Sequence, residues 1–151
     1  MKRVSAIKLA KTWEAGEAAD RIVLDAEGRN SRRIVMVAEK GTQFLLDWPH
    51  PVSLRDGDGL VLEDGSIIRV EGKPEPLIEI AAPHAADLAQ IAWHIGNRHT
   101  QVQVVDDKLR IRRDHVLEDM LRGLGARLTA IDAPFEPEPG AYQHTSGDLH
   151  V

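Results

Sequence analysis

The sequence predicts an α+β fold, with a small β domain over residues 1–72, a mixed domain over residues 73–135 and a flexible tail over residues 136–151. Three observations lead to this division. Short apolar runs alternate with turn signals in the first half of the chain, which favours short strands. Two later segments space their apolar residues as one face of a helix does. Beyond them, closely spaced prolines oppose further regular structure.

The first domain is expected to consist of short strands joined by close turns. Its clearest hairpin surrounds Asp64-Gly65, because Asp-Gly suits the positive φ angles of a type I′ turn. Another turn is expected over residues 47–51, where two prolines flank a histidine and Trp48 serves as an aromatic anchor. The predicted strands cover residues 4–9, 22–24, 34–37, 44–46, 60–62 and 67–70.

The pattern changes at residues 71–76, where Pro74 and Pro76 predict a stiff linker between the domains. The apolar run at residues 77–81 is then predicted as a strand. Further strands are expected at residues 102–105, 109–111 and 127–131, and Pro134 should end the last of them.

Two helices are predicted in the second domain. The first covers residues 84–95 and should end at Gly96-Asn97, since both residue types tolerate the left-handed conformation that terminates helices. Asp114 is suited to N-cap the second helix. The apolar faces consist of Leu88, Ile91, Ala92 and Ile95 in the first helix, and of Leu117, Met120, Leu121 and Leu124 in the second. The resulting order β-α-β-β-α-β is the ferredoxin-like arrangement, with both helices covering one face of a four-stranded sheet.

The composition excludes several classes of function. Without cysteine, the chain has no disulfide, no thiolate catalysis and no cysteine-bound metal. A formal net charge of −5 argues against nucleic acid as a main partner. The apolar runs are too short to cross a membrane. Lys8 and Lys11 interrupt the hydrophobic core that a signal peptide needs, so a cytoplasmic location is expected.

Histidines are the remaining candidates for binding a transition metal, because imidazole is the one side chain here with a preference for nickel, copper, zinc or cobalt. The densest pair is His94 and His99, at the end of the first predicted helix. The expected turn at Gly96-Asn97 would leave His99 on an exposed bend. The seven histidines are His50, His84, His94, His99, His115, His144 and His150.

The histidines other than His99 also have an interpretation without a metal, whereas at His99 a function is favoured. His94 can act as a favourable partner of the helix dipole, and for this residue the two readings have equal weight. His115, beside the N-cap, fits a surface residue of the first helical turn. His50 and His84 fit loop or helix-start positions, and histidines in a tail are often inert.

The sequence contains no recognisable catalytic motif. The glycines at 57 and 59 alternate with aspartates and are not followed by the Lys-Ser/Thr of a phosphate loop. The same segment lacks the ligand spacing of a calcium loop. No serine lies in a nucleophile elbow. We therefore do not expect an enzyme.

Three motifs resemble the urease accessory metallochaperones, the UreE family. The string AWHIGNRH at residues 92–99 resembles the family's aromatic-His-Leu-Gly-Asn-Arg-His signature, which is its most specific motif. DHVLEDML at residues 114–121 is similar to a second, less specific one. EPEPGAY at residues 136–142, with a histidine after it, resembles the approach to the family's tail. The resemblance extends over the whole chain.

This resemblance implies a β-rich peptide-binding domain followed by a ferredoxin-like domain that binds metal and forms a homodimer. It implies His99 as the main ligand, contributed by each subunit to a Ni²⁺ ion near the two-fold axis. His144 of each tail could complete the coordination, and His94 and His115 are possible secondary ligands or supports. Zn²⁺ and Cu²⁺ are also able to bind histidine sites, so the nickel preference comes from the resemblance alone.

The implied function is delivery of Ni(II) to apo-urease, in a complex with the accessory GTPase UreG. The chain departs from relatives that end in histidine-rich tracts, because it has only His144 and His150 after residue 140. A second hypothesis is a protein-binding adaptor that works without metal, since both predicted folds are common interaction modules. A third is a metal-dependent enzyme, which would need an open coordination position and a nearby acid or base.

Overall fold

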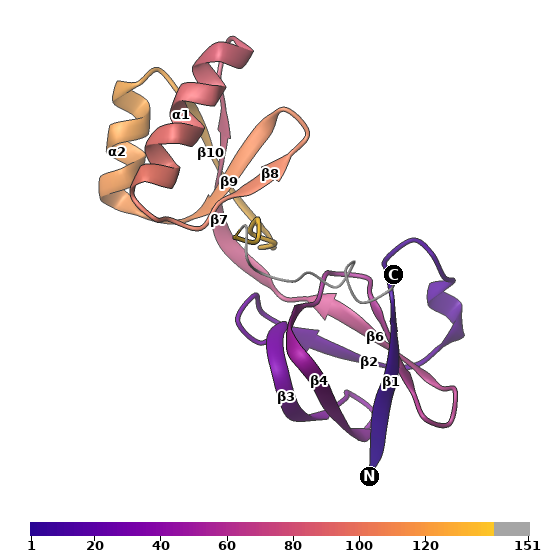
Figure 1. Cartoon of the computed structure of the whole chain (residues 1–151). Helices are drawn as coiled ribbons and strands as arrows, with labels where there is room; N and C mark the ends of the chain where they lie inside the picture. The colour runs from indigo at the N-terminus through magenta and orange to yellow at the C-terminus, as the bar shows by residue number, and fades with distance from the viewer. Residues whose placement is uncertain (141–151) are drawn as a thin grey trace. The chain divides into compact units, whose positions relative to one another are not determined.

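A computed structural model describes residues 1–140, so His144 and His150 lie outside the described residues. The chain forms two compact units, which divide between Lys73 and Pro74 (Figure 1). The first unit contains strands and one short 3-10 turn, whereas the second has a sheet and two helices. The prediction of a mixed α+β fold with a sheet-rich N-terminal part is therefore confirmed.

The first unit is a six-stranded sheet in the order β2-β6-β5-β1-β4-β3. Each strand overlaps one of the six predicted apolar runs. Their side chains form a continuous core, in which Phe44, Leu46 and Ile68 are fully buried. The strands are β1 (Lys2–Lys8), β2 (Ala18–Leu24), β3 (Asn30–Val37), β4 (Gln43–Ser53), β5 (Gly59–Leu62) and β6 (Ile67–Gly72).

The hairpin between β5 and β6 exists, but the prediction of a type I′ turn is wrong. Of the turn residues, Gly65 has a positive φ of 85°, while Asp64 does not. The Gly65 N–H donates to the Leu62 carbonyl at 2.9 Å, and the Leu62 N–H donates to the Ser66 carbonyl at 2.8 Å. This is a longer turn that closes on a left-handed glycine, the other common way of joining two antiparallel strands.

The turn predicted over residues 47–51 is also wrong, because β4 continues through both of its prolines. Arg33 lies opposite Asp47 and Ser31 lies opposite Val52, so Arg32 alone faces the extra residues of β4. Proline lacks the N–H that a ladder needs, and a bulge supplies positions where none is needed. The two prolines within residues 47–51 therefore mark an irregular part of β4, and they do not mark the end of the strand.

A tryptophan outside the sheet packs on the start of β5. The Trp13 indole N–H donates to the Gly57 carbonyl at 3.1 Å. A Cβ atom placed on Gly59 would lie 2.8 Å from Trp13 Cε2 and 3.0 Å from Ile67 Cγ2. Glycine at position 59 thus allows the indole ring to lie directly against the backbone.

We expect Gly59→Ala to destabilise the first unit by about 1–3 kcal/mol, because the added methyl group must displace the packed Trp13 ring. Urea unfolding followed by tryptophan fluorescence measures this change. The matched control is Gly16→Ala, where nothing lies within 4 Å of the new Cβ. Equal midpoints for the two variants would contradict the expectation.

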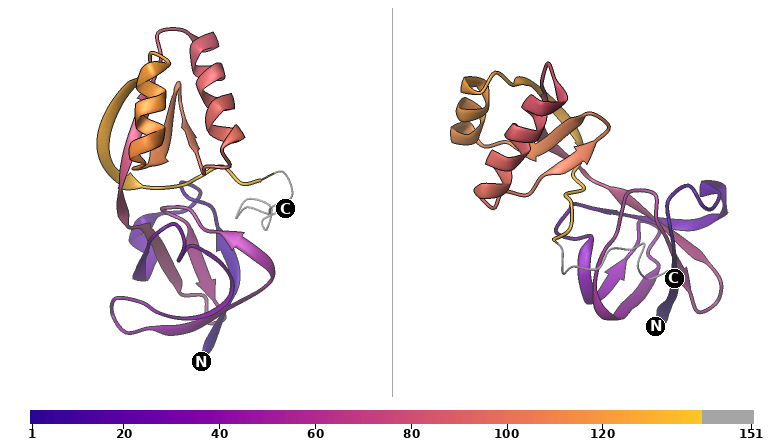
Figure 2. Two further views of the ribbon diagram at one scale, coloured as in Figure 1. Left: turned by 90° about the vertical axis from the view of Figure 1, so that its left-hand side faces the viewer. Right: turned by 45° about the horizontal axis from the view of Figure 1, so that its top comes forward.

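The second unit has the element order β7-α1-β8-β9-α2-β10, and its antiparallel sheet has the order β10-β7-β9-β8. Both helices lie on one face of this sheet (Figure 2). Ile91 and Ile95 of α1 and Leu117 and Leu121 of α2 pack there against a core that includes Ile80. The elements are β7 (Pro74–Ala81), α1 (Ala85–Asn97), β8 (Gln103–Val105), β9 (Lys108–Arg112), α2 (His115–Gly123) and β10 (Arg127–Pro134).

The stiff linker expected at residues 71–76 is wrong, because Lys73 alone separates β6 from β7. Pro74 and Pro76 both belong to β7 and pair with β10, whereas pairing with β9 begins only at Leu77. At this end β7 therefore has a neighbour on one side only. A proline whose missing N–H would face the open side costs the sheet no hydrogen bond.

The tail was expected to begin at residue 136, but the chain remains attached to the second unit through Glu138. Phe135 is fully buried, with the Arg112 guanidinium 4.8 Å from its ring centre. The Glu136 N–H donates to Gln103 Oε1 at 3.0 Å, and the Glu138 N–H donates to the Val102 carbonyl at 2.8 Å. Proline prevents a strand or helix here but leaves the other N–H groups available for such contacts.

None of the helices within residues 1–140 is both long and apolar enough to span a membrane.

Candidate metal centre

The end of α1 determines where His99 lies. Against expectation, α1 continues through Gly96 and Asn97, and the chain turns two residues later. The Arg98 N–H donates to the Ile95 carbonyl and the His99 N–H donates to the Gly96 carbonyl, both at 3.1 Å. His99 itself adopts the left-handed conformation, with φ of 57°. Gly96 and Asn97 tolerate that conformation but do not require it, so hydrogen bonding within the helix prevails.

His99 is therefore an exposed histidine that follows the last helical turn. A left-handed backbone costs a residue with a Cβ about 1–2 kcal/mol, whereas glycine adopts it freely. The chain keeps a histidine at a position where glycine would be more favourable. A strained non-glycine residue of this kind is a reason to look for a function.

His94 lies on α1 in contact with the exposed Trp93 ring. The two rings meet edge to face, with centroids 5.0 Å apart and an interplanar angle of 82°. His94 is half-buried, and Trp93 is 64% exposed. The indole thus restricts the orientation of the His94 imidazole without burying it. Trp93 therefore does not fill the core, although tryptophan side chains are largely buried on average.

His115 is the first residue of α2 and projects into solvent, with 92% of its side chain exposed. Its Nε2 atom lies 3.8 Å from Asp119 Oδ2, one helical turn further along. This is a solvent-exposed i,i+4 pair, which contributes little to stability. This position agrees with the interpretation of His115 as a surface residue in the first turn of the helix.

Asp114 caps α2 as predicted, and a buried carboxylate supports it. Asp114 Oδ1 accepts the Leu117 N–H at 3.0 Å, while Glu118 Oε2 accepts the Asp114 N–H at 2.8 Å. Glu118 also pairs with Arg113 at 3.1 Å. Burial alone would raise the pKa of Glu118, but the bonds from Arg113 and the Asp114 N–H outweigh it and leave the pKa below its ordinary value.

A carboxyl with a lowered pKa stabilises the fold above its ordinary pKa of about 4.3, and this stabilisation is lost as the pH falls through the folded value. We expect Glu118→Gln to destabilise the second unit by about 1 kcal/mol at pH 7, since Arg113 is half-exposed. The difference from the wild type should be constant above about pH 5 and should decrease as the pH falls below the ordinary glutamate pKa toward the lowered pKa of Glu118. Chemical unfolding at a series of pH values tests this. Asp119→Asn, at an exposed position, is the control, and a pH-independent difference for Glu118→Gln would contradict the explanation.

The predicted ligands do not form a complete site within one copy of residues 1–140. In that range, no three His, Asp or Glu side chains are grouped so that they could bind a metal ion. His84 is exposed at the start of α1, and His50 is half-buried in the irregular part of β4. Sequence reasoning placed His94 and His99 at the end of one helix correctly, but it could not supply the missing ligands.

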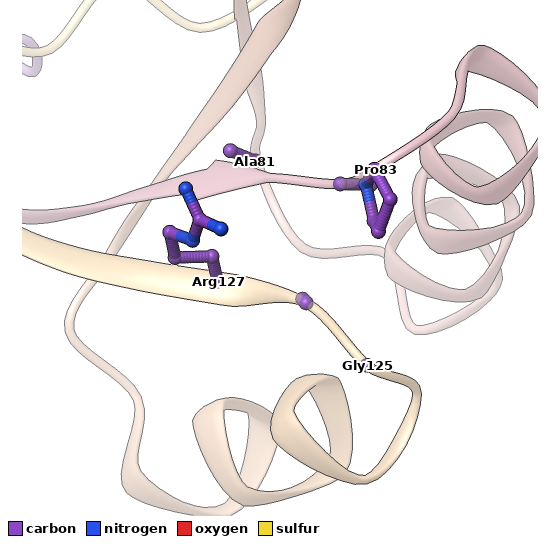
Figure 3. A pocket seen from close by; sticks show the side chains of 6 residues that line it. Ala81, Pro83, Gly125 and Arg127 are labelled. Carbon is purple, nitrogen blue, oxygen red and sulfur yellow. The ribbon is translucent and has the colours of Figure 1, made fainter.

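The cavity in Figure 3 is not a metal site. It has a volume of about 410 Å³ and lies where β7 and β10 meet the segments next to the helices. Arg127 is its one charged lining residue, and a guanidinium cannot act as a metal ligand. The other lining residues are small or apolar: Ala81, Ala82, Pro83, Gly125 and Ala126.

Two family models match the chain in succession. Residues 2–72 match the N-terminal domain of the UreE urease accessory protein, and residues 75–151 match its C-terminal domain. The chain belongs to the UreE family. Its members are named accessory proteins rather than enzymes, which confirms that no enzyme is to be expected here.

Several proteins named urease accessory protein UreE are similar over most of this chain. One from Rhodopseudomonas palustris (strain BisB18) is 51% identical over 99% of the chain and 71% of its own length. One from Bradyrhizobium sp. (strain ORS 278) is 52% identical over 85% of the chain, but the chain spans only 61% of that relative. One from Chelativorans sp. (strain BNC1) is 50% identical over 92% of the chain and 88% of its own length. These similarities place the chain in a family associated with urease maturation.

Proposed function

We propose that this protein is a nickel metallochaperone, which delivers Ni(II) to apo-urease during assembly of the urease active site. One observation carries the proposal. His99 is an exposed histidine that takes a left-handed conformation just after α1, and a strained non-glycine residue of this kind indicates a functional role. An exposed imidazole can bind an ion together with ligands of a second copy, and a partner's ligand can replace it when the ion is passed on.

In a homodimer, a metal site at His99 needs only a few ligands from each copy. A two-fold interface presents each surface residue twice, so one His99 per copy supplies two imidazoles to one ion. The ferredoxin-like unit of residues 73–135 is the proposed dimerisation and metal-binding domain. His144 of each tail is the proposed additional ligand, while His94 and His115 are supports or secondary ligands. Zn²⁺ and Cu²⁺ should compete, and Cu²⁺ should bind most tightly, because a site of nitrogen ligands follows the Irving–Williams order.

Release follows from the same arrangement. Ligands on an exposed surface can be replaced one at a time by ligands of a partner, so that the ion never passes free into water. The proposed partners are the urease apoprotein complex and the accessory GTPase UreG, and the proposed location is the cytoplasm. Support for these partners comes from the family to which the chain belongs.

The test is a nickel titration by calorimetry at neutral pH, combined with native mass spectrometry of the loaded protein. We expect one tightly bound ion for every two chains. One ion per monomer would contradict a site shared by two copies. No binding at micromolar nickel would reject the metallochaperone and favour the alternative below.

The alternative is a protein-binding adaptor that needs no metal, and the first unit carries the observation that favours it. Strand β3 lies at one edge of the six-stranded sheet. Ile34, Val35 and Val37 of this strand are 39%, 53% and 55% exposed. An exposed apolar edge strand can pair with an extended segment of another chain. The β-rich domain of residues 1–72 is accordingly the proposed peptide-binding domain in both hypotheses.

A double variant, Ile34→Lys with Val35→Lys, separates the two roles. We expect it to weaken binding to the urease apoprotein complex by about tenfold or more, because charged side chains oppose strand pairing at an edge. Nickel affinity should be unchanged. If the double variant still binds the partner normally, the apolar edge has no part in recognition, even if delivery of nickel fails.

A further inference from the structure

The segment of residues 98–102, which we call the bend, carries His99 from the end of α1 to β8. The first two N–H groups of the bend donate to carbonyls in the last turn of α1, both at 3.1 Å. Within residues 1–140, the backbone of Thr100 and Gln101 makes no hydrogen bond, and the next backbone bond is at Val102. The left-handed conformation of His99 persists only where neighbouring contacts hold it. The nearest such contact on the C-terminal side of His99 comes from a side chain.

That contact joins Gln101 to Arg112, the last residue of β9. Arg112 Nη1 donates to Gln101 Oε1 at 2.6 Å. The backbone pairing of β8 with β9 stops at Gln103, which lies opposite Arg110. Because alternate residues of a strand share a face, Gln101 and Arg112 are the next pair on that face. Their side chains thus continue the pairing beyond the end of the backbone ladder, toward His99.

Arg112 is itself held by two further partners. Its Nε atom donates to Glu75 Oε1 at 3.3 Å, and its guanidinium carbon lies 4.8 Å from the centre of the Phe135 ring. Glu75 belongs to β7, and Phe135 is fully buried. A planar guanidinium with three partners has little freedom to turn. Arg112 therefore connects the bend to the rigid part of the second unit.

Arg110 provides a natural comparison, because it lies two residues earlier on the same face of β9. Its Nε and Nη2 atoms bind Glu79 Oε2, both at 3.0 Å. Within residues 1–140 it makes no hydrogen bond or ion pair with the bend. The two arginines thus separate stabilisation of the sheet, which both provide, from attachment of the bend, which only Arg112 provides.

We propose that Arg112 is a positioning residue of the metal site, which acts through Gln101 to hold His99 ready for the ion. The inference rests on the proposed nickel function, because this position of His99 matters only if His99 is a ligand. At most about 7 Å separates the Cα atoms of His99 and Gln101, so a fixed Gln101 limits the positions that His99 can take. A ligand that is already ordered loses less conformational freedom when the ion binds.

The first experiment measures the bend in the absence of metal, by NMR relaxation of the amides at positions 99–101. We expect order parameters of a rigid backbone, about 0.85, in the wild type and in Arg110→Gln. In Gln101→Ala they should fall toward about 0.6, because the bend loses its side-chain attachment. Gln101→Glu keeps an acceptor oxygen for Arg112 and should remain rigid. Unchanged order parameters in Gln101→Ala would overturn the proposal.

The second experiment measures nickel affinity by calorimetry. Gln101→Ala should weaken binding about three- to tenfold, which is less than the loss of about 10- to 100-fold for a group that contacts a ligand directly. Gln101→Glu should bind nickel as the wild type does. Arg110→Gln should do so as well, although it breaks an ion pair of the same sheet. Unchanged affinity in Gln101→Ala, or an equal loss in Arg110→Gln, would overturn the inference.

A double-mutant cycle assigns the effect to Arg112. Gln101→Ala combined with Arg112→Gln should weaken nickel binding no more than Arg112→Gln alone, because both substitutions remove the same contact. Additive losses would contradict the proposal. Should Arg112→Gln fail to fold, the comparison of Gln101→Ala with Gln101→Glu decides. Nickel binding that ignores His99 would instead reject the proposed function, while the relaxation measurement would still decide whether the bend is held through Gln101.

Discussion

Replacement of His99 by glycine is expected to abolish the tight nickel site and to leave the fold intact. Removing a residue that merely supports a ligand already costs about 10- to 100-fold in metal affinity. Loss of the ligand itself, on both copies of a dimer, should therefore exceed about 100-fold. Glycine is the informative choice because the φ of 57° at this position suits it. Alanine would remove the imidazole but retain the strain of a left-handed residue.

The control for this variant is His84→Ala. His84 is an exposed histidine at the N-cap of α1, and its side chain makes no capping hydrogen bond. Its loss should leave the nickel affinity unchanged, which separates a specific site from general binding by surface histidines. Calorimetry gives the affinity, and urea unfolding should show that His99→Gly changes the stability by no more than about 1 kcal/mol. A wild-type nickel affinity in His99→Gly would contradict the assignment of His99 as the metal ligand.

Phe135→Ala is expected to have the largest effect on stability, lowering the unfolding free energy of the second unit by about 3–5 kcal/mol. Phe135 is fully buried and lies just after β10, where the Arg112 guanidinium stacks on its ring. Arg112 also binds Glu75 at 3.3 Å and Gln101 at 2.6 Å. Truncation therefore leaves a cavity and removes the surface against which this arginine is held.

Hydrogen exchange measures the effect in each unit separately. In Phe135→Ala the amides of β7 and β9 should exchange much faster, while those of β5 and β6 should be unchanged, because each unit has its own core. Phe135→Leu is the matched control and should lose less than half as much stability, since most of the cavity remains filled. Loss of protection in both units alike would show that they do not unfold separately.

The sequence predicted the secondary structure where local chemistry decides it. Asp114 caps α2 as expected, because its carboxylate and the Leu117 N–H are three residues apart and no distant residue intervenes. The helix faces around Ile91 and Leu117 were recognisable because a helical repeat is a property of neighbouring residues. Both were found without knowledge of the sheet on which they pack.

Proline was the main source of error, since its effect depends on whether a partner strand needs its N–H. Pro49 and Pro51 lie in the bulged part of β4, and Pro74 and Pro76 lie where β7 has one neighbour. Local rules treat all four as breaks. Only the pairing of the strands shows that the missing hydrogen bonds were not required there.

By itself, the sequence determined the α+β class, the candidate histidines and the family. These depend on residue type and spacing, which are explicit in the chain. The tertiary structure decided that His99 rather than Gly96-Asn97 takes the left-handed turn, and that no three-ligand group exists within residues 1–140. It also decided that Glu138 is bound at the edge of β8, next to the segment that follows His99. The contact of Glu138 requires groups more than 30 residues apart to meet, and the free energy of that meeting comes from the packed sheet and not from any local pattern.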